Sequence, residues 1–352
     1  MFKLTKYNAY TLLSQFRTPF KILNDLGMRL SYLFGLKKFP FLPSSLDIES
    51  VNNCNFRCPH CQVTHWDKEV SHLQISAFEK VLNQFPSLIW VKLQGMGEPL
   101  LNKNLIPMLQ LGEKRNIWMS FTTNASLLNH RIASQLAALT KTSVYFSIDG
   151  ASAEVFESIR VGSRFSVVCE NIKSFTSLIK IKNKSRITAW MVLTKQNFHE
   201  VEDVVLLVKK LGITKLTLQP FLNNWGKDEM ADYIDELKLS PSQIFSDTTD
   251  ATLAKAQKLA KEQGIKLEIY RRDFYTKHRK CPWPWKSAYI CTNGDVVPCP
   301  ILADSDTVKM GNIYEQDFRE IWNSEQYQEL RQCHINYDLP KYCQHCYLNT
   351  EH

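Results

Sequence analysis

Short apolar segments recur along the chain from residue 45 onward, and polar residues separate one from the next. Six of these segments have the length and the branched or aromatic content of buried strands. They are Ser45–Val51, Leu88–Gln94, Ile117–Thr122, Ser143–Ile148, Arg186–Leu193 and Thr214–Gln219.

Between these segments, apolar residues recur at the spacing of an amphipathic helix. The helical patterns lie near 76–85, 104–115, 129–139, 166–179 and 199–211. Strand followed by helix, repeated about six times, predicts an α/β fold with a parallel sheet and right-handed crossovers. Because an eightfold barrel needs more units, we expect a partial (βα)6 TIM-like barrel, with its active site at the carboxyl ends of the strands.

Beyond residue 240 the alternation stops. A helical pattern at 241–263 leads into Lys266–Tyr270, a basic run to Lys280 and a tail rich in Cys, Pro and Trp. We expect three parts, which are a basic, aromatic, helical segment at 1–43, the (βα)6 core at 44–265 and a small Cys-rich domain at 266–352.

The composition is that of a globular protein, with 352 residues of which 44% are hydrophobic and 22% charged. No apolar run reaches the roughly 18 residues of a membrane span, and the N-terminus lacks the pattern of a secretory signal. We therefore expect a cytoplasmic protein. In that setting, ten cysteines indicate metal or redox chemistry rather than disulfides.

Three of the cysteines, Cys54, Cys58 and Cys61, lie within eight residues directly after the first predicted strand. Iron–sulfur clusters are held by cysteine thiolates, and three thiolates leave one iron of a four-iron cluster free for a small molecule. A zinc site is the alternative, with His60 or His65 as the fourth ligand.

This Cys-x3-Cys-x2-Cys spacing after the first strand of a βα barrel resembles the radical S-adenosylmethionine (SAM) superfamily. The resemblance implies that SAM binds the open iron, and that one electron from the reduced [4Fe–4S] cluster releases a 5′-deoxyadenosyl radical that abstracts a substrate hydrogen. It also implies that His60 packs beside the adenine, where relatives more often carry an aromatic or apolar residue.

Further segments carry the same resemblance. Gly95-Met96-Gly97-Glu98-Pro99 follows the second strand and is similar to the family's Gly-Gly-Glu-Pro segment, which receives the methionyl amine. Asn124 follows the third strand, and Ser147, at the end of the fourth, matches a serine that contacts the ribose.

Three further residues have a functional and a plain interpretation. Arg160 or Arg164 suits the methionyl carboxylate, since a guanidinium forms a fork with it, but each is equally well a solvated helix-end arginine. Asp149 is either functional or part of a turn with Gly150. Met191 and Gln219, at strand ends, are expected to line the cavity.

Six cysteines lie in the tail between 281 and 346. The spacing of these cysteines resembles the twitch domain, the shorter relative of the SPASM extension. Twelve residues separate Cys281 from Gly294, four separate Gly294 from Cys299, and Cys343-x2-Cys346 follows later. The resemblance implies one fully ligated auxiliary [4Fe–4S] cluster on Cys281, Cys299, Cys343 and Cys346, and no second auxiliary cluster. A zinc ribbon is the alternative for the same four thiolates.

Cys291 and Cys333 are left over from this set. Each is a buried thiol, a substitute ligand or a hydrogen-atom donor to a substrate radical. Cys169 lies in an apolar helical pattern and is expected in the core.

The net charge of +8 is concentrated in residues 1–43, which hold seven Lys or Arg and one acid. With so little charge elsewhere, no nucleic-acid partner is expected. This segment either packs over the open edge or the bottom of the barrel with its basic face solvated, which we favour, or contacts the inner membrane face as a peripheral helix.

The leading hypothesis for function is dehydrogenation of a carbohydrate or aminocyclitol, a peptide or a lipid-linked substrate by a radical SAM oxidoreductase, with flavodoxin or ferredoxin as the electron donor. The alternatives are an epimerase or peptide-maturation enzyme and, from another class, a non-catalytic iron–sulfur or zinc protein.

Overall fold

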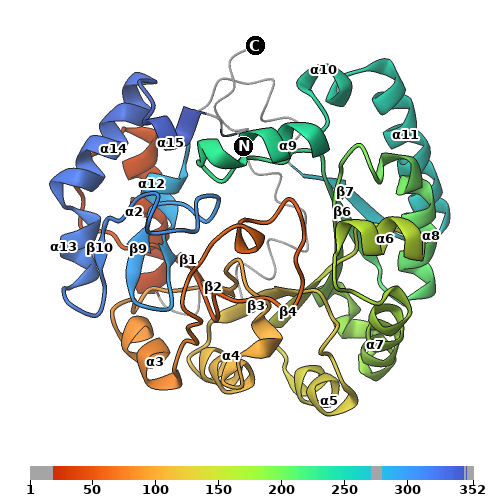
Figure 1. Cartoon of the computed structure of the whole chain (residues 1–352). Helices are drawn as coiled ribbons and strands as arrows, with labels where there is room; N and C mark the ends of the chain where they lie inside the picture. The colour runs from red at the N-terminus through yellow and green to blue at the C-terminus, as the bar shows by residue number, and fades with distance from the viewer. Residues whose placement is uncertain (1–18, 271–279, 345, 347–352) are drawn as a thin grey trace.

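A curved sheet of ten strands organises the part of the chain that the computed structural model describes, which is residues 19–270, 280–344 and 346 (Figure 1). The strand order is β10-β9-β8-β1-β2-β3-β4-β5-β6-β7. The first seven strands along the chain all run parallel, and they are β1 (Ser45–Ile48), β2 (Trp90–Leu93), β3 (Trp118–Thr123), β4 (Thr142–Ser147), β5 (Ile187–Val192), β6 (Lys215–Gln219) and β7 (Lys266–Ile269).

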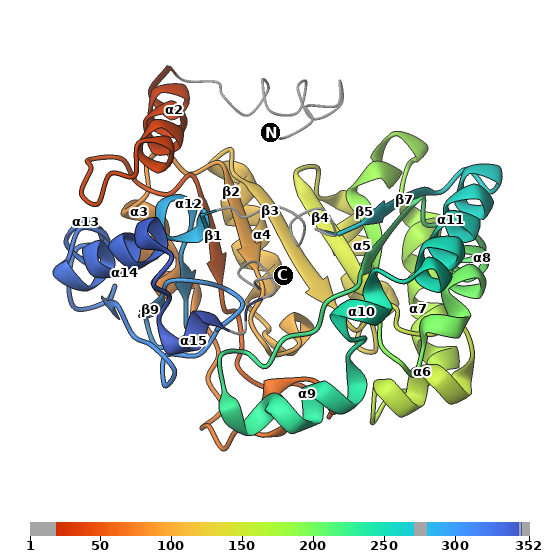
Figure 2. The ribbon, with the colours of Figure 1, turned by 90° about the horizontal axis from the view of Figure 1, so that it is seen from above.

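Helices cover the outer, convex side of this sheet, as Figures 1 and 2 show. In chain order they are α3 (Ile75–Asn83), α4 (Leu105–Lys114), α5 (His130–Ala138), α6 (Ala153–Ile159), α7 (Phe165–Leu178), α8 (Val201–Lys210) and α11 (Asp247–Glu262). The α/β fold with a partial barrel, predicted from the alternation of the two periods, is confirmed.

Local sequence explains where these helices begin and how closely they pack. Asn129 begins α5, because its side-chain oxygen accepts a hydrogen bond from the Ile132 N–H at 3.0 Å. Gly112 lets α4 approach β3, since a Cβ at this position would lie 2.1 Å from the sulfur of Met119.

The structure adds a seventh parallel strand that the six-unit prediction lacks. β7 pairs with β6, but Lys266 and Glu268 alternate with Leu267 and Ile269, and its side chains are only partly buried. Such an edge strand has a weak apolar pattern, which is why the sequence did not reveal it. The helix α6 and the short helix α9 (Ala231–Leu237) were also not predicted, whereas the helical pattern expected at 241–263 covers both α10 (Pro241–Ile244) and α11.

The C-terminal region joins the same sheet on the other side of β1. β8 (Tyr289–Ile290) runs parallel to β1, and β9 (Asp295–Val297) and β10 (Gly311–Asn312) continue antiparallel. One short helix, α12 (Trp283–Lys286), precedes these strands, and three helices follow them, which are α13 (Phe318–Trp322), α14 (Glu325–Asn336) and α15 (Lys341–Gln344). Because one sheet continues through both expected domains, the limits 44–265 and 266–352 remain our proposal.

The prediction that Met191 lines the cavity is wrong. Met191 is fully buried and pairs in register with Leu218 on the helix-covered side of the sheet. Its neighbours Trp190 and Val192 face the other way, toward the concave side, and the Trp190 indole donates to the Gln219 side chain at 3.1 Å. Side chains alternate strictly along a strand, so Met191 cannot share that face.

The N-terminal helix α2 (Pro19–Leu33) packs against the amino-terminal ends of β1 and β2. Figure 2 shows it at the opposite end of the barrel from α9. The first part of the expected N-terminal segment, residues 1–18, and most of the basic run, residues 271–279, lie outside the described residues. No helix in the described part of the chain is long and apolar enough to cross a membrane.

Arg331 of α14 links the C-terminal helices to the segment between α2 and β1. Its side chain is fully buried, and its guanidinium lies 4.5 Å from the ring centre of Phe39 and 4.6 Å from that of Trp322. It donates to the backbone oxygens of Pro284 at 2.9 Å and Lys37 at 2.6 Å. Aromatic faces and two carbonyls together compensate the buried charge.

We expect Arg331→Met to lower the free energy of unfolding by about 3 kcal/mol. The variant leaves two buried carbonyls without their hydrogen-bond donor and removes the cation that packs on the rings of Phe39 and Trp322. The matched control is Arg319→Met, at an exposed arginine of α13 that donates to Pro40 at 3.0 Å, and it should change the free energy by less than about 0.5 kcal/mol. Chemical denaturation measures both, and equal losses in the two variants would contradict this role.

Candidate functional site

Three thiols lie in the loop that follows β1. Cys54, Cys58 and Cys61 are all free, and the Cys61 N–H donates to the Cys58 carbonyl at 3.0 Å, which folds the loop back on itself. Burial, with the neighbouring thiols, raises the pKa of Cys54 to about 11 and that of Cys61 to about 12. Without a metal these thiols stay protonated, and a bound metal centre would displace their protons.

The Gly-x-Gly-Glu segment after β2 packs directly against this loop. A Cβ on Gly97 would lie 2.3 Å from the Val51 carbonyl and 2.4 Å from the Asn53 carbonyl, so only glycine fits there. The Glu98 N–H donates to the Asn53 carbonyl at 2.9 Å. The segment therefore holds the residue that immediately precedes Cys54.

The Glu98 carboxylate joins the ends of β2 and β3. It is buried and accepts hydrogen bonds from Leu100 N at 3.0 Å, Thr123 Oγ1 at 2.6 Å and Asn124 N at 2.8 Å. The Asn124 amide in turn donates to Asn55 at 3.0 Å and contacts the Cys54 sulfur at 3.8 Å. Glu98 thus holds Asn124, and the Asn124 amide contacts the first thiol.

Arg160 brings a buried positive charge to the same loop. Its Nε donates to Asp149 Oδ2 at 2.6 Å, and Asp149 Oδ1 accepts from the Val192 N–H at 2.8 Å. Burial alone would lower the Arg160 pKa, but Asp149 and the thiol of Cys58 raise it above its usual range. Asp149 thus positions Arg160 beside the thiols, while Arg164 only begins α7.

His60 and Ser147 are the two other residues that the resemblance assigns to this site. His60 is buried, which lowers its pKa to about 4 and keeps the ring neutral, and its carbonyl accepts from the Trp225 indole at 3.1 Å. Ser147 ends β4, half-buried, in register with Trp190 of β5.

The zinc alternative has little support in the described residues. His65 is exposed, its ring nitrogen lies 2.9 Å from the Pro59 carbonyl, and its ring packs on Tyr233. A four-iron cluster, by contrast, takes thiolates from the separate corners of a cube.

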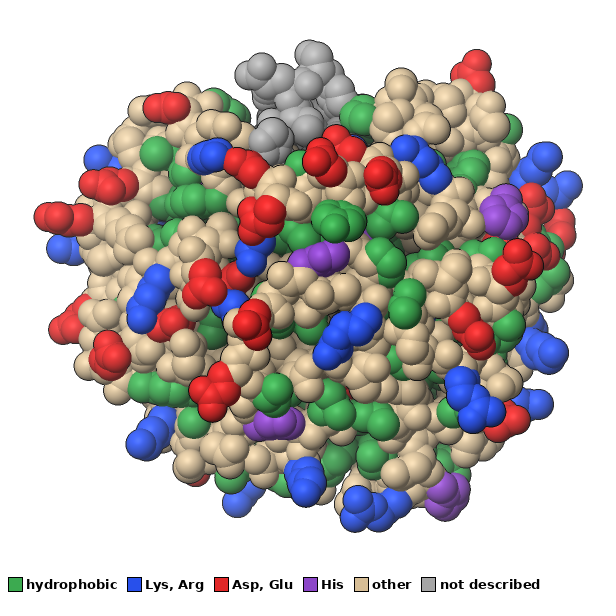
Figure 3. Space-filling view, viewed as in Figure 1, with side chains coloured by type: hydrophobic (Ala, Val, Ile, Leu, Met, Phe, Trp, Pro, Cys, Tyr) green, Lys and Arg blue, Asp and Glu red, His purple; other side chains and the backbone are tan. Residues whose placement is uncertain are grey.

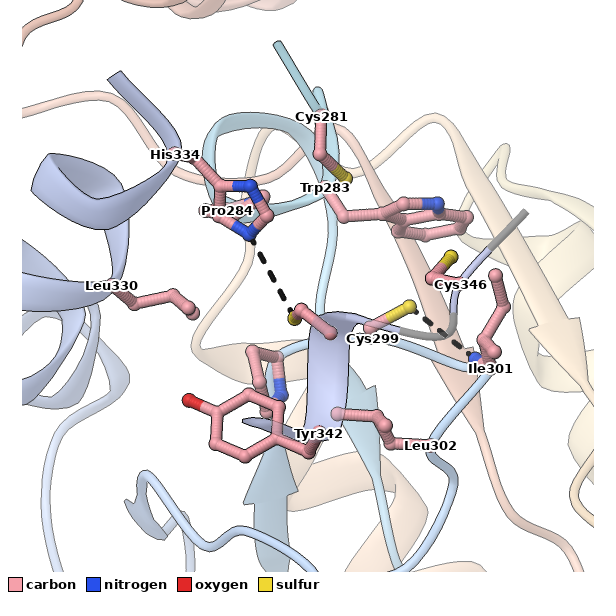
Figure 4. A pocket seen from close by; sticks show the side chains of 12 residues that line it. Cys281, Trp283, Pro284, Cys299, Ile301, Leu302, Leu330, His334, Tyr342 and Cys346 are labelled. Atoms are coloured by element: carbon pink, nitrogen blue, oxygen red, sulfur yellow. Dashed lines mark hydrogen bonds between the residues drawn. The ribbon is translucent and has the colours of Figure 1, made fainter. Parts of the chain in front are cut away.

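The second set of cysteines lines one pocket, shown in Figure 4. Cys281, Cys299, Cys343 and Cys346 lie around it, with Trp283 and Leu330 among its apolar walls. Burial raises the pKa of Cys299 and Cys343, and the neighbouring thiols raise it further. Four thiols without a carboxylate, in an apolar pocket, fit an iron–sulfur cluster whose ligands are all cysteines.

The two remaining tail cysteines lie in different places. Cys333, on α14, is partly buried and close enough to Cys343 and Tyr342 to influence their pKa values. Cys291 follows β8 and lines a separate cavity of about 500 Å³. Cys169 is partly buried on α7 and packs against the core.

The cavity beside Cys291 lies between the thiol loop and the C-terminal region. Its lining includes Asn52, two residues before Cys54, and Asp304, five residues after Cys299. Asp304 is buried and pairs with Lys68 of the thiol loop and, at 2.5 Å, with Lys227 after β6. Figure 3 shows acidic and basic side chains close together over this part of the surface.

Sequence reasoning missed Glu49, which lines the same cavity. It follows β1 and accepts hydrogen bonds from the Tyr289 hydroxyl at 3.1 Å and the Thr292 N–H at 3.2 Å. Burial raises its pKa to about 7 although these hydrogen bonds lower it. Gly95 leaves room for Glu49 and Tyr289, because a Cβ at this position would lie 2.5 Å from Glu49 Cγ. The sequence feature that could have indicated Glu49 as a site residue is a single acid at the end of a predicted buried strand.

Comparison with known proteins identifies two regions of the chain. Residues 48–237 match the radical SAM superfamily, and residues 281–347 match SPASM, an iron–sulfur cluster-binding domain. Both sets of thiols fall inside these regions.

The whole chain is also similar to individual proteins. It is 26% identical over 334 residues, 86% of this chain and 87% of the relative, to the tungsten-containing aldehyde ferredoxin oxidoreductase cofactor-modifying protein of Pyrococcus furiosus. It is 23% identical to the mycofactocin maturase MftC of Mycolicibacterium smegmatis, over 82% of this chain and 73% of MftC. The crystal structure of Streptococcus suis SuiB bound to precursor peptide SuiA superposes with a TM-score of 0.68 at 17% identity, covering 89% of this chain and 72% of SuiB.

Metal analysis tests the two thiol sets separately. Anaerobically reconstituted protein should contain about eight irons per chain, because each four-iron cluster contributes four. The Cys54/Cys58/Cys61→Ala variant and the Cys281/Cys299/Cys343/Cys346→Ala variant should each retain about four. Replacing Cys169, which neither set uses, is the control. Zinc in place of iron, or loss of all iron in both variants, would contradict the assignment.

The raised pKa of Glu49 predicts a pH-dependent stability. Between its unfolded pKa near 4.5 and its folded pKa of about 7, the folded state holds a proton that the unfolded state releases. The stabilisation is complete below pH 4.5 and is lost as the pH rises through 7, by up to about 1.4 kcal/mol per pH unit. Denaturant unfolding at several pH values should show that Glu49→Gln removes this slope and that Glu69→Gln, on the exposed rim of the same cavity, keeps it. An unchanged slope in Glu49→Gln would refute the assignment.

Proposed function

The chain belongs to the radical SAM superfamily and carries a SPASM-type iron–sulfur domain, and on this basis we propose that it modifies a peptide by abstracting a hydrogen atom from it. A peptide substrate, the kind of modification and the residues that bind SAM are parts of this proposal. Membership of the family and the SPASM domain establish the cofactors, which are SAM and iron–sulfur clusters.

The three-cysteine loop supplies the ligands for the cluster that binds SAM. When present, that cluster supplies the electron that cleaves SAM and so generates the 5′-deoxyadenosyl radical. We propose that Glu98, on the segment with Gly95 and Gly97, and Arg160 position the two ends of the methionyl group. The Asp149 carboxylate restrains Arg160, which presents a fixed positive charge to a carboxylate.

Asn124, Ser147 and His60 are proposed to contact the nucleoside part. The Asn124 amide reaches the Cys54 sulfur at 3.8 Å. Ser147 is at the carboxyl end of β4, and the buried, neutral His60 offers an uncharged ring for adenine packing. All three lie at the edge of the sheet where active sites of such barrels form.

The observation that carries the peptide proposal is the cavity of about 500 Å³ between the thiol loop and the C-terminal region. It has the size of an ordinary ligand pocket and is lined by Glu49, Cys291, Lys68 and Asp304, groups suited to backbone and polar side chains. One similar protein is a maturase, and another was solved with a precursor peptide. The similar proteins named above give no support to carbohydrate dehydrogenation, and we do not propose it.

We propose a two-electron oxidation as the outcome, which makes the protein an oxidoreductase, and a flavodoxin or ferredoxin as the electron donor. The four thiols at Cys281, Cys299, Cys343 and Cys346 can hold a cluster that accepts an electron from the substrate radical. All four line one apolar pocket, which supports a single auxiliary cluster at this place.

Epimerisation is the second candidate, because Cys291 lines the cavity with its thiol buried. A hydrogen-atom donor must face the substrate radical, and Cys291 satisfies this condition while Cys333 lies beside the auxiliary pocket. Replacing Cys291 therefore separates the two outcomes.

The test uses reconstituted protein reduced with dithionite and the small peptides encoded beside the gene. We expect one 5′-deoxyadenosine per modified peptide and a product two hydrogen atoms lighter. The Cys291→Ala variant should form this product at an unchanged level, as should the control Cys333→Ala. Solvent deuterium at an inverted carbon that depends on Cys291 would establish epimerisation instead. Absence of SAM cleavage would leave a non-catalytic iron–sulfur protein.

A further inference from the structure

The helix α2 has its polar side chains turned toward the protein. The buried Lys21 donates to the Leu88 carbonyl at 2.7 Å. The buried Asn24 donates to the Leu42 carbonyl at 2.7 Å and accepts from the Leu42 N–H at 3.1 Å. Gly27 lies against the ring of Phe41, where a Cβ would come within 2.4 Å. These contacts fix how the helix is rotated about its axis.

The opposite face of α2 is apolar and exposed. Leu23 is 62% exposed, Leu33 70% and Phe34 70%. The face consists of Phe20, Leu23, Leu26, Leu30, Leu33 and Phe34. Successive members lie mostly three or four residues apart, so they form one stripe along the helix. We call it the α2 apolar face.

This distribution is the reverse of a helix that packs on its own protein. A surface helix normally buries its apolar stripe and exposes its polar one. Rolling α2 to bury the stripe would break the hydrogen bonds of Lys21 and Asn24 and leave their buried partners unpaired. In the described residues, eight of the fifteen exposed large hydrophobic side chains lie between 20 and 36, and such a concentration indicates an interaction surface.

The charge around the α2 apolar face is positive. The one acid among residues 1–43, Asp25, is paired with Arg29 at 2.7 Å and accepts from Ser44 at 3.0 Å. Lys37 and Lys38 are exposed just after the helix. A second copy of this chain would bring two positive surfaces together, whereas an anionic surface would complement both the charge and the apolar stripe.

The position of α2 leaves the site accessible. Leu42 and Leu88, its hydrogen-bond partners, precede β1 and β2, so the helix lies at the amino-terminal ends of the strands. The thiol loop follows the carboxyl end of β1. In Figure 2, α2 and α9 lie at opposite ends of the barrel. A surface bound to α2 would therefore face away from the thiol loop.

We propose that the α2 apolar face docks the protein on a membrane that contains anionic lipid, with the helix lying in the plane of the interface. Apolar side chains enter the boundary between headgroups and acyl chains, and the exposed Lys37 and Lys38 contact lipid phosphates. The expectation of a solvated basic outer face for this segment is thereby replaced, for α2, by an apolar one.

The test is co-sedimentation of the full reconstituted chain with vesicles of phosphatidylcholine alone or with phosphatidylglycerol added. We expect binding to the anionic vesicles that weakens as salt rises. Leu23→Gln with Leu30→Gln should lower the partition coefficient about tenfold. The matched control is Leu178→Gln with Leu206→Gln, two partly exposed leucines on α7 and α8, and it should bind like the wild type. SAM cleavage without vesicles should be equal in all three proteins.

Three results would overturn the proposal. Equal binding to neutral and anionic vesicles would remove the role of charge. Light scattering that shows a dimer which the α2 double variant dissociates would assign the face to a second copy of the chain. Absence of vesicle binding by the wild type would refute docking on a membrane.

Discussion

The buried carboxylate of Glu98 is the interaction on which the site depends. It has three hydrogen-bond donors, from Leu100, Thr123 and Asn124, and its own N–H binds the residue before Cys54. A buried charge without such partners would be costly, so these donors must lie where they do. The ends of β2 and β3 are thereby fixed against the loop that follows β1, and the first thiol occupies a defined place.

The second set of thiols is tied to the first through the same sheet. β8 pairs with β1, so the C-terminal region continues the barrel instead of hanging from a linker. Asp304 binds Lys68 and Lys227, and the Gln62 side chain donates to the Leu302 carbonyl at 3.0 Å. Electron transfer and radical chemistry both require fixed distances between the reacting groups. These contacts hold the two sets of thiols in place on either side of the cavity that Cys291 lines.

The sequence predicted the features that follow a repeat or a fixed residue spacing. The six strands and the two cysteine sets follow such rules, and the structure gathers Cys281, Cys299, Cys343 and Cys346 in one pocket. It did not reveal which face of β5 is concave, because Trp190, Met191 and Val192 are all apolar. Glu49 and Asp304 are single acids whose roles arise only from partners far away in sequence. For the N-terminal segment the sequence left open packing on the barrel and membrane contact, and we favoured a solvated basic face because helices are expected to bury their apolar side.

The central claim is that Cys54, Cys58 and Cys61 hold a cluster with one iron open to SAM. Electron paramagnetic resonance of the reduced chain tests it most directly in the variant that lacks the four auxiliary cysteines, because only the first cluster remains. Addition of SAM should change that spectrum. An unchanged spectrum, with iron present, would contradict the account.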